Sequence, residues 1–313
     1  MALLEVRDLK VYFPVYGGIF RRIVDRIKAV DGVNLTIEPG HTYGLVGESG
    51  SGKTTTGRAI IGLNPITSGQ ILFQGEDIGW GMRGHQSRFR KDIQMIFQDP
   101  YSSLNPKKRI LDIVSEPLRN FEKLTPAEEK RRVQELLAQV GLSSETIYKY
   151  PHEFSGGQRQ RIGIARAIAL KPKLIIADEP VSSLDVSVQA QVLNFMQDIQ
   201  KELHLTYLFI SHDLGIIRHM CDHIGIMYRG RYVEQGTTRE IFENPQHIYT
   251  KRLLAAIPDL DPSQRGKRQR QRQLIYQEYD KEFSQYFDHD GLAYALRPLS
   301  DTHSAAIPGR GQG

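Results

Sequence analysis

The stretch GESGSGKTT combines closely spaced glycines with a lysine and two threonines, a composition suited to holding phosphate groups. Glycine lets the backbone fold tightly enough to turn successive N–H groups toward phosphate oxygens. An apolar run at residues 43–46 precedes the stretch and a helix-like run at 55–63 follows it, so the loop occupies a strand-to-helix turn. The sequence therefore predicts a phosphate-binding loop made of Gly47, Glu48, Ser49, Gly50, Ser51, Gly52, Lys53, Thr54 and Thr55.

Two side chains of this loop carry the charge and the oxygen donor that a bound nucleotide needs. The Lys53 ammonium is placed to neutralise the β- and γ-phosphates, and the Thr54 hydroxyl is placed to hold Mg²⁺. A nucleoside triphosphate with Mg²⁺ is therefore the predicted ligand of the loop.

Two apolar runs further along the chain end in side chains that could act on this ligand. The run that begins at Lys173 ends in two carboxylates, Asp178 and Glu179. Such runs form strands buried on both faces, and ligands of open α/β sheets bind at their carboxyl ends. Asp178 is therefore placed to hold a water bound to Mg²⁺, and Glu179 to accept a proton from the attacking water. His212 ends the second run and is a candidate contact for the γ-phosphate.

A second glycine-rich element, at residues 154–158, precedes another predicted helix. Ser155 is a favourable N-cap, and residues 158–170 carry their apolar side chains on one side, as an amphipathic helix does. One phosphate chain has no geometric need for two anion sites, so the second is expected to serve the nucleotide of a neighbouring subunit. This second site consists of Ser155, Gly156, Gly157 and Gln158.

Six elements occur in the order found in ABC transporter ATP-binding subunits, and the chain resembles that family over about residues 3–258. Phe154 departs from the family pattern, in which the signature usually begins with leucine, but the phosphate-facing residues after it are intact. The elements resemble the Walker A, Q-loop, signature, Walker B, D-loop and H-loop motifs, at residues 47–54, 98, 154–158, 178–179, 183–185 and 212.

The resemblance implies an α/β fold of the P-loop NTPase class. Its expected parts are a RecA-like core, an antiparallel β subdomain, and an α-helical signature subdomain at about residues 99–170. Together they would form an ABC ATP-binding domain over residues 1–258, followed by a C-terminal extension at residues 259–313. The expected ligands are ATP and Mg²⁺, and the expected activity is ATP hydrolysis.

The resemblance also implies roles for single residues. Gln98 would sense the γ-phosphate and Mg²⁺ and would relay the state of the nucleotide to membrane subunits. The Mg²⁺ ion would be held by Thr54, Gln98 and Asp178. Asp185 would align the water across a dimer interface. An aromatic residue after the first strand stacks on adenine in this family; Phe13 is the first candidate and Tyr12 the second, and either could instead fill space in a strand.

Several stretches resemble the oligopeptide/dipeptide importer branch, in particular its second, F-type ATP-binding subunit. They are GESGSGKTT, QMIFQDPYSSLNP, YPHEFSGGQRQRIGIARA, SLDVSVQAQVLN and NPQHIYTKRLLAAIP. This branch implies a heterodimer with a homologous ATP-binding subunit, two transmembrane permease subunits and, indirectly, an extracytoplasmic peptide-binding protein. Many such subunits end in a cysteine-bearing region that this chain lacks, so no iron–sulfur cluster is predicted. A nickel or other small-solute importer, and a soluble ABC ATPase that acts on ribosomes or DNA, are the alternatives.

Composition agrees with this interpretation but is less specific. A net charge of +5 and a pI near 9.1 are modest, so no nucleic-acid partner is predicted. The single cysteine, Cys221, argues for a reducing cytosol. No apolar run approaches the roughly 20 residues that span a bilayer, so the chain can reach a membrane only by docking. The resemblance to a transporter subunit implies a peripheral place on the cytoplasmic face of the membrane.

Spacing and composition also predict local structure outside the motifs. Residues 14–28 are expected to form a long loop, and residues 126–140 a helix that stops at Gly141. The extension begins with a basic, glutamine-rich stretch at 261–273, predicted to be a solvated linker or a contact for anionic lipid or an acidic loop of a membrane subunit. A short aromatic helix and a disordered tail over the last dozen residues are expected after it.

Overall fold

The computed structural model describes residues 1–18, 20, 22–78, 86–99, 103–257 and 265–308. The chain divides into two compact units. The first contains residues 1–3, 37–41 and 73–210, and the second contains residues 4–36, 42–72 and 211–313. No helix within the described ranges has the length and apolar character needed to cross a membrane.

The second unit is built on a sheet with the strand order β11-β12-β10-β9-β3. β3 (Thr42–Val46) pairs in parallel with β9 (His223–Tyr228), and β10 (Arg231–Thr237) pairs antiparallel with β9. Two short strands, β12 (Ser304–Ala305) and β11 (Arg297–Pro298), extend the sheet beyond β10. Every residue of β3 is buried, as its apolar sequence predicts.

Helices of the second unit follow these strands. α1 (Lys53–Ile60) begins at the predicted strand-to-helix turn after β3. α7 (Leu214–Met220) packs on β3 beside Gly44, where an added Cβ would lie 2.8 Å from the sulfur of Cys221. α8 (Thr238–Glu243) and α9 (Ile248–Ala255) come after β10 and lead into the C-terminal extension.

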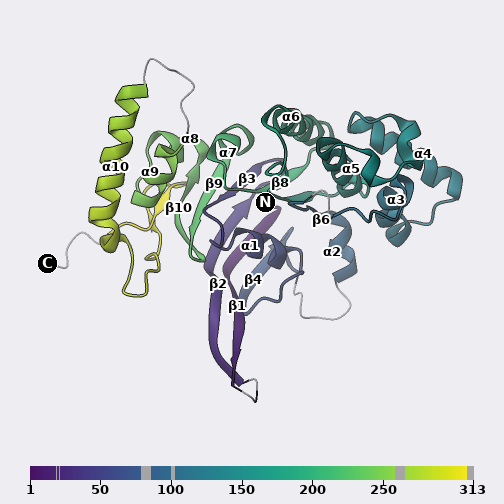
Figure 1. Cartoon of the computed structure of the whole chain (residues 1–313). Helices are drawn as coiled ribbons and strands as arrows, with labels where there is room; N and C mark the ends of the chain where they lie inside the picture. Colours follow the sequence, from purple (N-terminus) through teal and green to yellow (C-terminus); the bar gives the residue numbers. More distant parts are fainter. Residues whose placement is uncertain (19, 21, 79–85, 100–102, 258–264, 309–313) are drawn as a thin grey trace. The chain divides into compact units, whose positions relative to one another are not determined.

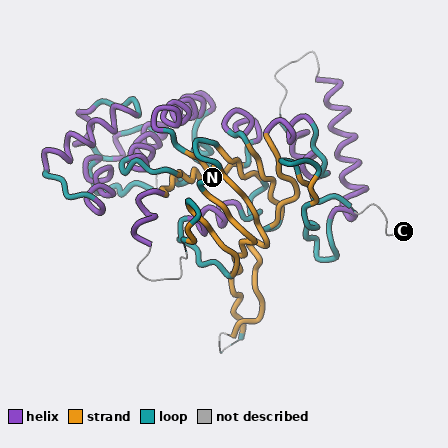
Figure 2. The backbone as a smooth tube through the Cα atoms, turned by 180° about the vertical axis from the view of Figure 1, so that it is seen from behind, coloured by secondary structure: helices purple, strands orange, loops and turns teal. Residues whose placement is uncertain are grey.

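The loop predicted at residues 14–28 is wrong, because most of these residues lie in a long β-hairpin. β1 (Leu4–Gly17) and β2 (Arg22–Ile37) are its arms, and β4 (Ser68–Phe73) pairs with the other side of β1. Figure 2 shows the two arms side by side along their length. The sequence pattern did not predict these strands, because the outer part of the hairpin has no buried face. Apolar side chains are exposed there, including those of Tyr16, Ile23 and Ile27.

The first unit contains three parallel strands in the order β8-β7-β6. They are β6 (Ile93–Ile96), β7 (Leu174–Asp178) and β8 (Thr206–Ser211). Leu174 lies opposite both Ile93 and Thr206, so the carboxyl ends of the strands meet at one edge of the sheet. All residues of β7 are buried, as the unbroken apolar run predicts.

Three helices of the first unit pack together: α3 (Ile110–Phe121), α4 (Pro126–Gln139) and α5 (Gly156–Ile168). The helix predicted at 126–140 is confirmed, and a capping box between Thr125 and Glu128 begins it. The buried side chains of these helices include Val114, Leu118, Val133, Leu137 and Ile162. The other elements of this unit are β5 (Glu76–Asp77), α2 (Gln86–Asp92), α6 (Val186–Leu203) and the 3₁₀ turns Ser144–Tyr148 and Pro151–Glu153.

The C-terminal extension contains more helix than its composition predicts. α10 (Arg265–Tyr286) has 22 residues and includes most of the stretch predicted as a basic linker, while residues 258–264 lie outside the described part of the chain. The helix packs along α9 (Figure 1). Its aromatic face meets rings from the rest of the second unit, and this burial favours the helix. The cluster consists of Tyr228, His247, Tyr249, Tyr279, Phe283, Tyr286 and Phe287.

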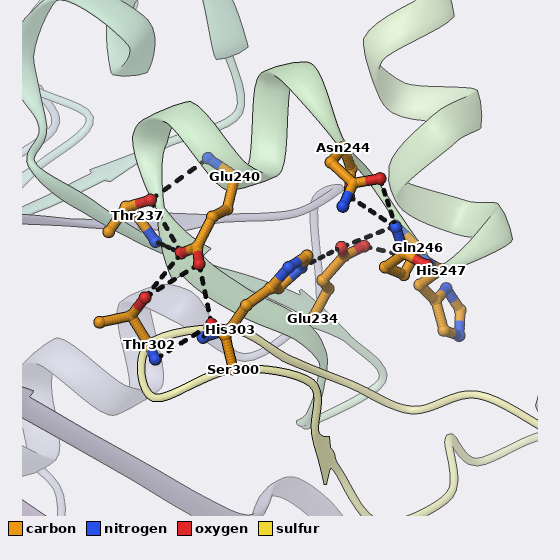
Figure 3. Close-up of polar contacts among 9 residues, drawn as sticks. All are labelled: Glu234, Thr237, Glu240, Asn244, Gln246, His247, Ser300, Thr302 and His303. Atoms are coloured by element: carbon orange, nitrogen blue, oxygen red, sulfur yellow. Dashed lines mark hydrogen bonds and ion pairs between the residues drawn. The ribbon is translucent and has the colours of Figure 1, made fainter.

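Residues 302–308 are folded, in contrast to the predicted disordered tail; residues 309–313 lie outside the described residues. Ala305 and Ala306 are fully buried. Figure 3 shows two carboxylates that hold the preceding turn: Glu240 accepts hydrogen bonds of 2.9 Å from the hydroxyls of Ser300 and Thr302. Glu234 lies 2.8 Å from Nε2 of His303.

The lowered pKa of the Glu240 carboxylate makes the stability of the folded chain depend on pH. Burial opposes its ionisation, but hydrogen bonds from Thr237, Ser300 and Thr302 outweigh burial and lower the pKa of Glu240 to about 2. The ionised form therefore stabilises the fold above the ordinary pKa of 4.5, and this stabilisation is lost as the pH falls from 4.5 toward 2. Glu240→Gln is expected to lower stability at pH 7 by about 1 kcal/mol and to weaken the acid-induced loss.

Thermal unfolding followed by circular dichroism between pH 7 and pH 2 measures both effects. Glu243→Gln is the matched control, because Glu243 is an exposed carboxylate of the same helix. A melting temperature that falls with pH as steeply in Glu240→Gln as in the parent chain would contradict the assignment.

Candidate functional site

The predicted phosphate loop lies between β3 and α1, and its shape depends on two glycines. Gly47 has a φ of 156° and Gly52 a φ of 106°. A Cβ at position 47 would lie 2.3 Å from the carbonyl oxygen of Met227, and one at position 52 would lie 2.3 Å from that of Ala29. β9 and β2 thus approach the loop so closely that only glycine fits at these positions.

The ammonium group of Lys53 lies inside this loop, and only 4% of the residue is exposed. Its Nζ donates hydrogen bonds of 2.7 Å to the carbonyl oxygen of Gly47 and 2.9 Å to that of Glu48. These partners offset the cost of burying a cation. The N-cap residue of α1 is Gly52, which offers no side-chain cap, and the positive end of the helix dipole favours an anion at the loop. The loop therefore combines a cation with a helix N-terminus, as phosphate binding requires.

The two predicted carboxylates lie at the end of β7. Asp178 is the last residue of the strand and is buried. Glu179 has a φ of 45°, a conformation that residues with side chains rarely adopt, and its N–H donates a 2.9 Å hydrogen bond to the carbonyl of Ile210. Gln98 Nε2 donates a 2.9 Å hydrogen bond to Glu179 Oε2. The structure thus brings the Q-loop glutamine to the proposed base, a contact that the sequence did not predict.

The second predicted anion site is the start of α5, where the helix is confirmed. Ser155 and Gln158 form a capping box, with hydrogen bonds of 3.4 and 3.0 Å between side chain and backbone, and both residues are exposed. An added Cβ on Gly157 would lie 2.3 Å from the side chain of Val188. Phe154, the departure from the family pattern, is 6% exposed and anchors the turn.

The remaining predicted residues lie at element ends. His212 follows β8, and Asp185 is the N-cap residue of α6; both are exposed. The phosphate loop and His212 belong to the second unit, whereas the Q-loop, signature, Walker B and D-loop residues belong to the first. Within the first unit, Gln98 and Glu179 are in contact.

The chain matches two protein families and is similar to known ATP-binding proteins over most of its length. Residues 30–182 match the ABC transporter family, and residues 233–285 match the oligopeptide/dipeptide transporter C-terminal region. The chain is 54% identical over 310 residues to the oligopeptide transport ATP-binding protein OppF of Lactococcus lactis subsp. lactis (strain IL1403), covering 99% of this chain and 97% of that protein. The oligopeptide transport ATP-binding protein AppF of Bacillus subtilis (strain 168) is 53% identical over 257 residues, covering 82% of this chain and 78% of that protein. The chain belongs to the ABC transporter ATPase family.

Solved structures confirm the fold predicted for an ABC ATPase. The chain matches cbiO1 from Clostridium perfringens, part of the transporter complex cbiONQ, with a TM-score of 0.67 and 29% identity over 80% of this chain and 95% of that one. It also matches the ATP-binding cassette MJ0796, solved as a dimer bound to ADP and Pi, with a TM-score of 0.67 and 26% identity. This match covers 75% of this chain and 99% of that one. The chain is accordingly an ATP-binding and ATP-hydrolysing protein.

The two candidate adenine-stacking residues of this ABC ATPase have different surroundings. The Tyr12 hydroxyl donates to Asp31, which also receives hydrogen bonds of 2.9 and 2.7 Å from Arg231. Burial, followed by the Asp31 contact, raises the pKa of Tyr12 to about 12. Phe13 is 37% exposed. Tyr12 is thus held by neighbouring polar groups, while the ring of Phe13 is accessible, which favours Phe13 as the adenine contact.

The available metal donors are hard oxygens. The Thr54 residue is half-buried at the start of α1, and the Asp178 carboxylate is buried at the end of β7. Across the described residues, no group of three or more His, Cys, Asp or Glu side chains is placed to hold a metal ion. Mg²⁺ usually takes one or two protein oxygens and completes its shell with phosphate and water. Each of these two oxygens, considered within its own unit, is of the type that Mg²⁺ accepts.

Two residues that the sequence patterns did not predict contact the phosphate loop. The hydroxyl of Tyr249 accepts a 3.3 Å hydrogen bond from the N–H of Glu48, 201 positions away in sequence. Arg252, three residues later, lies 3.8 Å from the Glu48 carboxylate. Both belong to the stretch NPQHIYTKRLLAAIP, which predicted a branch of the family but contained no signal for a contact with the loop.

The glycine geometry of the loop predicts a difference between two alanine variants. Gly50→Ala meets no atom within 4 Å and is strained only by its positive φ of 80°, at a cost of about 1–2 kcal/mol. Gly52→Ala adds the collision with Ala29 and is expected to destabilise the chain more and to remove ATP binding. Urea unfolding and equilibrium titration with ATP measure these effects. Equal stability of the two variants would contradict the close approach of β2 to the loop.

Proposed function

We propose that this ATPase powers the import of oligopeptides or dipeptides, as a peripheral subunit on the cytoplasmic face of the cell membrane. The observation that carries this proposal is the 54% identity, over 99% of the chain, to an oligopeptide transport ATP-binding protein. The match of residues 233–285 to the oligopeptide/dipeptide transporter C-terminal region supports it. Both similarities extend past the nucleotide-binding motifs into the region that distinguishes this branch.

We assign nucleotide binding to the loop after β3. Its backbone N–H groups and the Lys53 ammonium would bind the phosphates, and Phe13 would stack on the adenine. Thr54 and Asp178, with Gln98, would hold Mg²⁺, which supplies positive charge against the triphosphate when it is bound. The buried position of Lys53 supports this role, because its amine is already aligned with the loop carbonyls.

Glu179 would act as the general base, accepting a proton from the attacking water. Its strained backbone and its hydrogen bond with Gln98 hold the carboxylate in one orientation. Gln98 would respond to the γ-phosphate and so connect the nucleotide state with the base and with the membrane subunits. His212 would contact the γ-phosphate, and Asp185 would align the water across the dimer interface.

The assembly we propose is a heterodimer with a homologous ATP-binding subunit, docked on two transmembrane permeases and supplied by an extracytoplasmic peptide-binding protein. Each nucleotide would lie between the Walker A loop of one subunit and the signature helix of the other. The exposed N-terminus of α5 supports this arrangement, since an anion from another chain has access to it.

Two substitutions separate ATP binding from hydrolysis. Glu179→Gln removes the base and is expected to retain ATP binding while hydrolysis falls about 10²- to 10⁴-fold. Lys53→Ala removes the loop cation and is expected to weaken binding itself. ATP titration of the chain and turnover of the assembled transporter measure the two effects. Near-normal turnover of Glu179→Gln would disprove its role as base.

Reconstitution tests the transport proposal and the shared site together. With its partner ATPase and permeases in proteoliposomes, peptide-loaded binding protein is expected to stimulate ATP hydrolysis and peptide uptake, whereas nickel is not. Ser155→Arg places a guanidinium at the anion site and is expected to abolish both activities while the chain still binds ATP. Ser155→Ala, which removes only the cap, is the control and is expected to keep part of the activity. Full activity of Ser155→Arg would refute the shared site.

A further inference from the structure

One face of α9 contacts the outer side of the phosphate loop. Tyr249 and Arg252 are three residues apart, so their side chains lie on the same face of the helix. The Tyr249 hydroxyl accepts the 3.3 Å hydrogen bond from the Glu48 N–H, and the Arg252 guanidinium lies 3.8 Å from the Glu48 carboxylate. Neither residue belongs to the nucleotide-binding motifs at residues 47–54, 98, 154–158, 178–179, 183–185 and 212.

A single peptide unit of the loop is held on both of its sides. The carbonyl of Gly47 accepts the 2.7 Å hydrogen bond from Lys53, and the N–H of Glu48 in the same unit donates to Tyr249. Because a peptide unit is planar, fixing its N–H also fixes the direction of its carbonyl. The orientation of the Gly47 carbonyl, and with it one anchor of the Lys53 ammonium, therefore depends on Tyr249.

Aromatic packing fixes the two side chains of α9 themselves. Tyr249 is fully buried, and its ring centroid lies 4.9 Å from that of Tyr228. The Arg252 guanidinium lies over the ring of Tyr279 in α10, 4.5 Å from its centroid. Burial also raises the pKa of Tyr249, so its hydroxyl remains neutral. The Tyr249 contact to the loop is thus made by a fully buried side chain, and the Arg252 guanidinium rests on an aromatic ring.

The start of α9 is fixed by a buried carboxylate (Figure 3). Glu234 accepts hydrogen bonds of 2.8 Å from the N–H of Gln246 and 2.9 Å from that of His247, and it also lies 2.8 Å from Nε2 of His303. Nδ1 of His247 in turn accepts a 3.1 Å hydrogen bond from the N–H of Tyr249. Burial lowers the pKa of His247 to about 3, so this nitrogen remains an acceptor at neutral pH. The tail of the chain is therefore joined to the phosphate loop through Glu234 and α9.

We propose that Tyr249 and Arg252 are positioning residues for ATP binding, through which the C-terminal region holds the Walker A loop in its phosphate-binding shape. This inference rests on the proposed function of the loop. Tyr249 acts on the backbone that orients Lys53, and Arg252 restrains the side chain of Glu48. The Tyr249 contact is the stronger one, because the Arg252 and Glu48 side chains are 39% and 51% exposed and their attraction is screened by solvent.

The test is a conservative variant of the full-length chain, Tyr249→Phe, which keeps the ring and removes the hydroxyl. Loss of one hydrogen bond to the loop is expected to raise the dissociation constant for ATP with Mg²⁺ about 3- to 10-fold. In the assembled transporter, KM for ATP is expected to rise by a similar factor while kcat changes less than about 2-fold, because the general base is untouched. Arg252→Gln is expected to have a smaller effect that disappears at high salt.

Tyr286→Phe is the matched control, since Tyr286 belongs to the same aromatic cluster and packs on His247 instead of the loop. It is expected to leave the ATP dissociation constant unchanged, and both tyrosine variants are expected to melt close to the parent chain. Unchanged ATP affinity in Tyr249→Phe, or equal losses of affinity in both variants, would overturn the inference.

Titration of Lys53→Ala with ATP separates two conclusions: that Tyr249 does not position the loop, and that the loop does not bind the nucleotide. Weak ATP binding by Lys53→Ala together with normal binding by Tyr249→Phe would overturn only the positioning role. Normal ATP binding by Lys53→Ala would overturn the assignment of the loop itself, and with it the inference.

Discussion

The buried ammonium of Lys53 is the constraint on which the phosphate loop depends. A cation that is 4% exposed requires hydrogen-bond acceptors, and the loop supplies two carbonyl oxygens by folding around the amine. That shape requires glycine at Gly47 and Gly52, where β9 and β2 approach most closely. It also requires the parallel register of β3 and β9, in which Val46 lies opposite Ile226. Strand pairing therefore determines where the charge of Lys53 lies.

A comparable constraint operates at the strand ends of the first unit. The left-handed backbone of Glu179 is unfavourable by itself and persists because groups on two neighbouring strands hold it. Ile210 in β8 accepts its N–H, and Gln98 beyond β6 donates to its carboxylate. The backbone and the carboxylate of Glu179 are thus each held by a residue from a strand that neighbours β7 or from the segment that follows it.

The C-terminal region is held by side-chain contacts that its amino-acid composition does not predict. α10 begins in a stretch rich in arginine and glutamine, yet Phe283 near its end and Phe287 just after it pack against Tyr228, whose ring also contacts Tyr249. Two acidic residues, Glu234 and Glu240, bind the turn before β12 and return the chain to the sheet edge. The long hairpin of β1 and β2 likewise depends on backbone pairing, so its exposed apolar residues do not mark it as structured.

The sequence by itself determined several features whose physical cause is local. Glycine and lysine spacing predicted the loop at residues 47–54. Apolar residues at helical spacing and the stop at Gly141 predicted the helix that became α4, and the Ser155 N-cap predicted the one that became α5, because these signals lie within a few residues of one another. Only the tertiary structure decided which distant groups meet. Gln98 reaches Glu179 across 81 positions, and Glu48 reaches Tyr249 across 201, because parallel strands and a returning C-terminal helix bring these segments together. No local pattern encodes such contacts, since their partners are supplied by other elements of the fold.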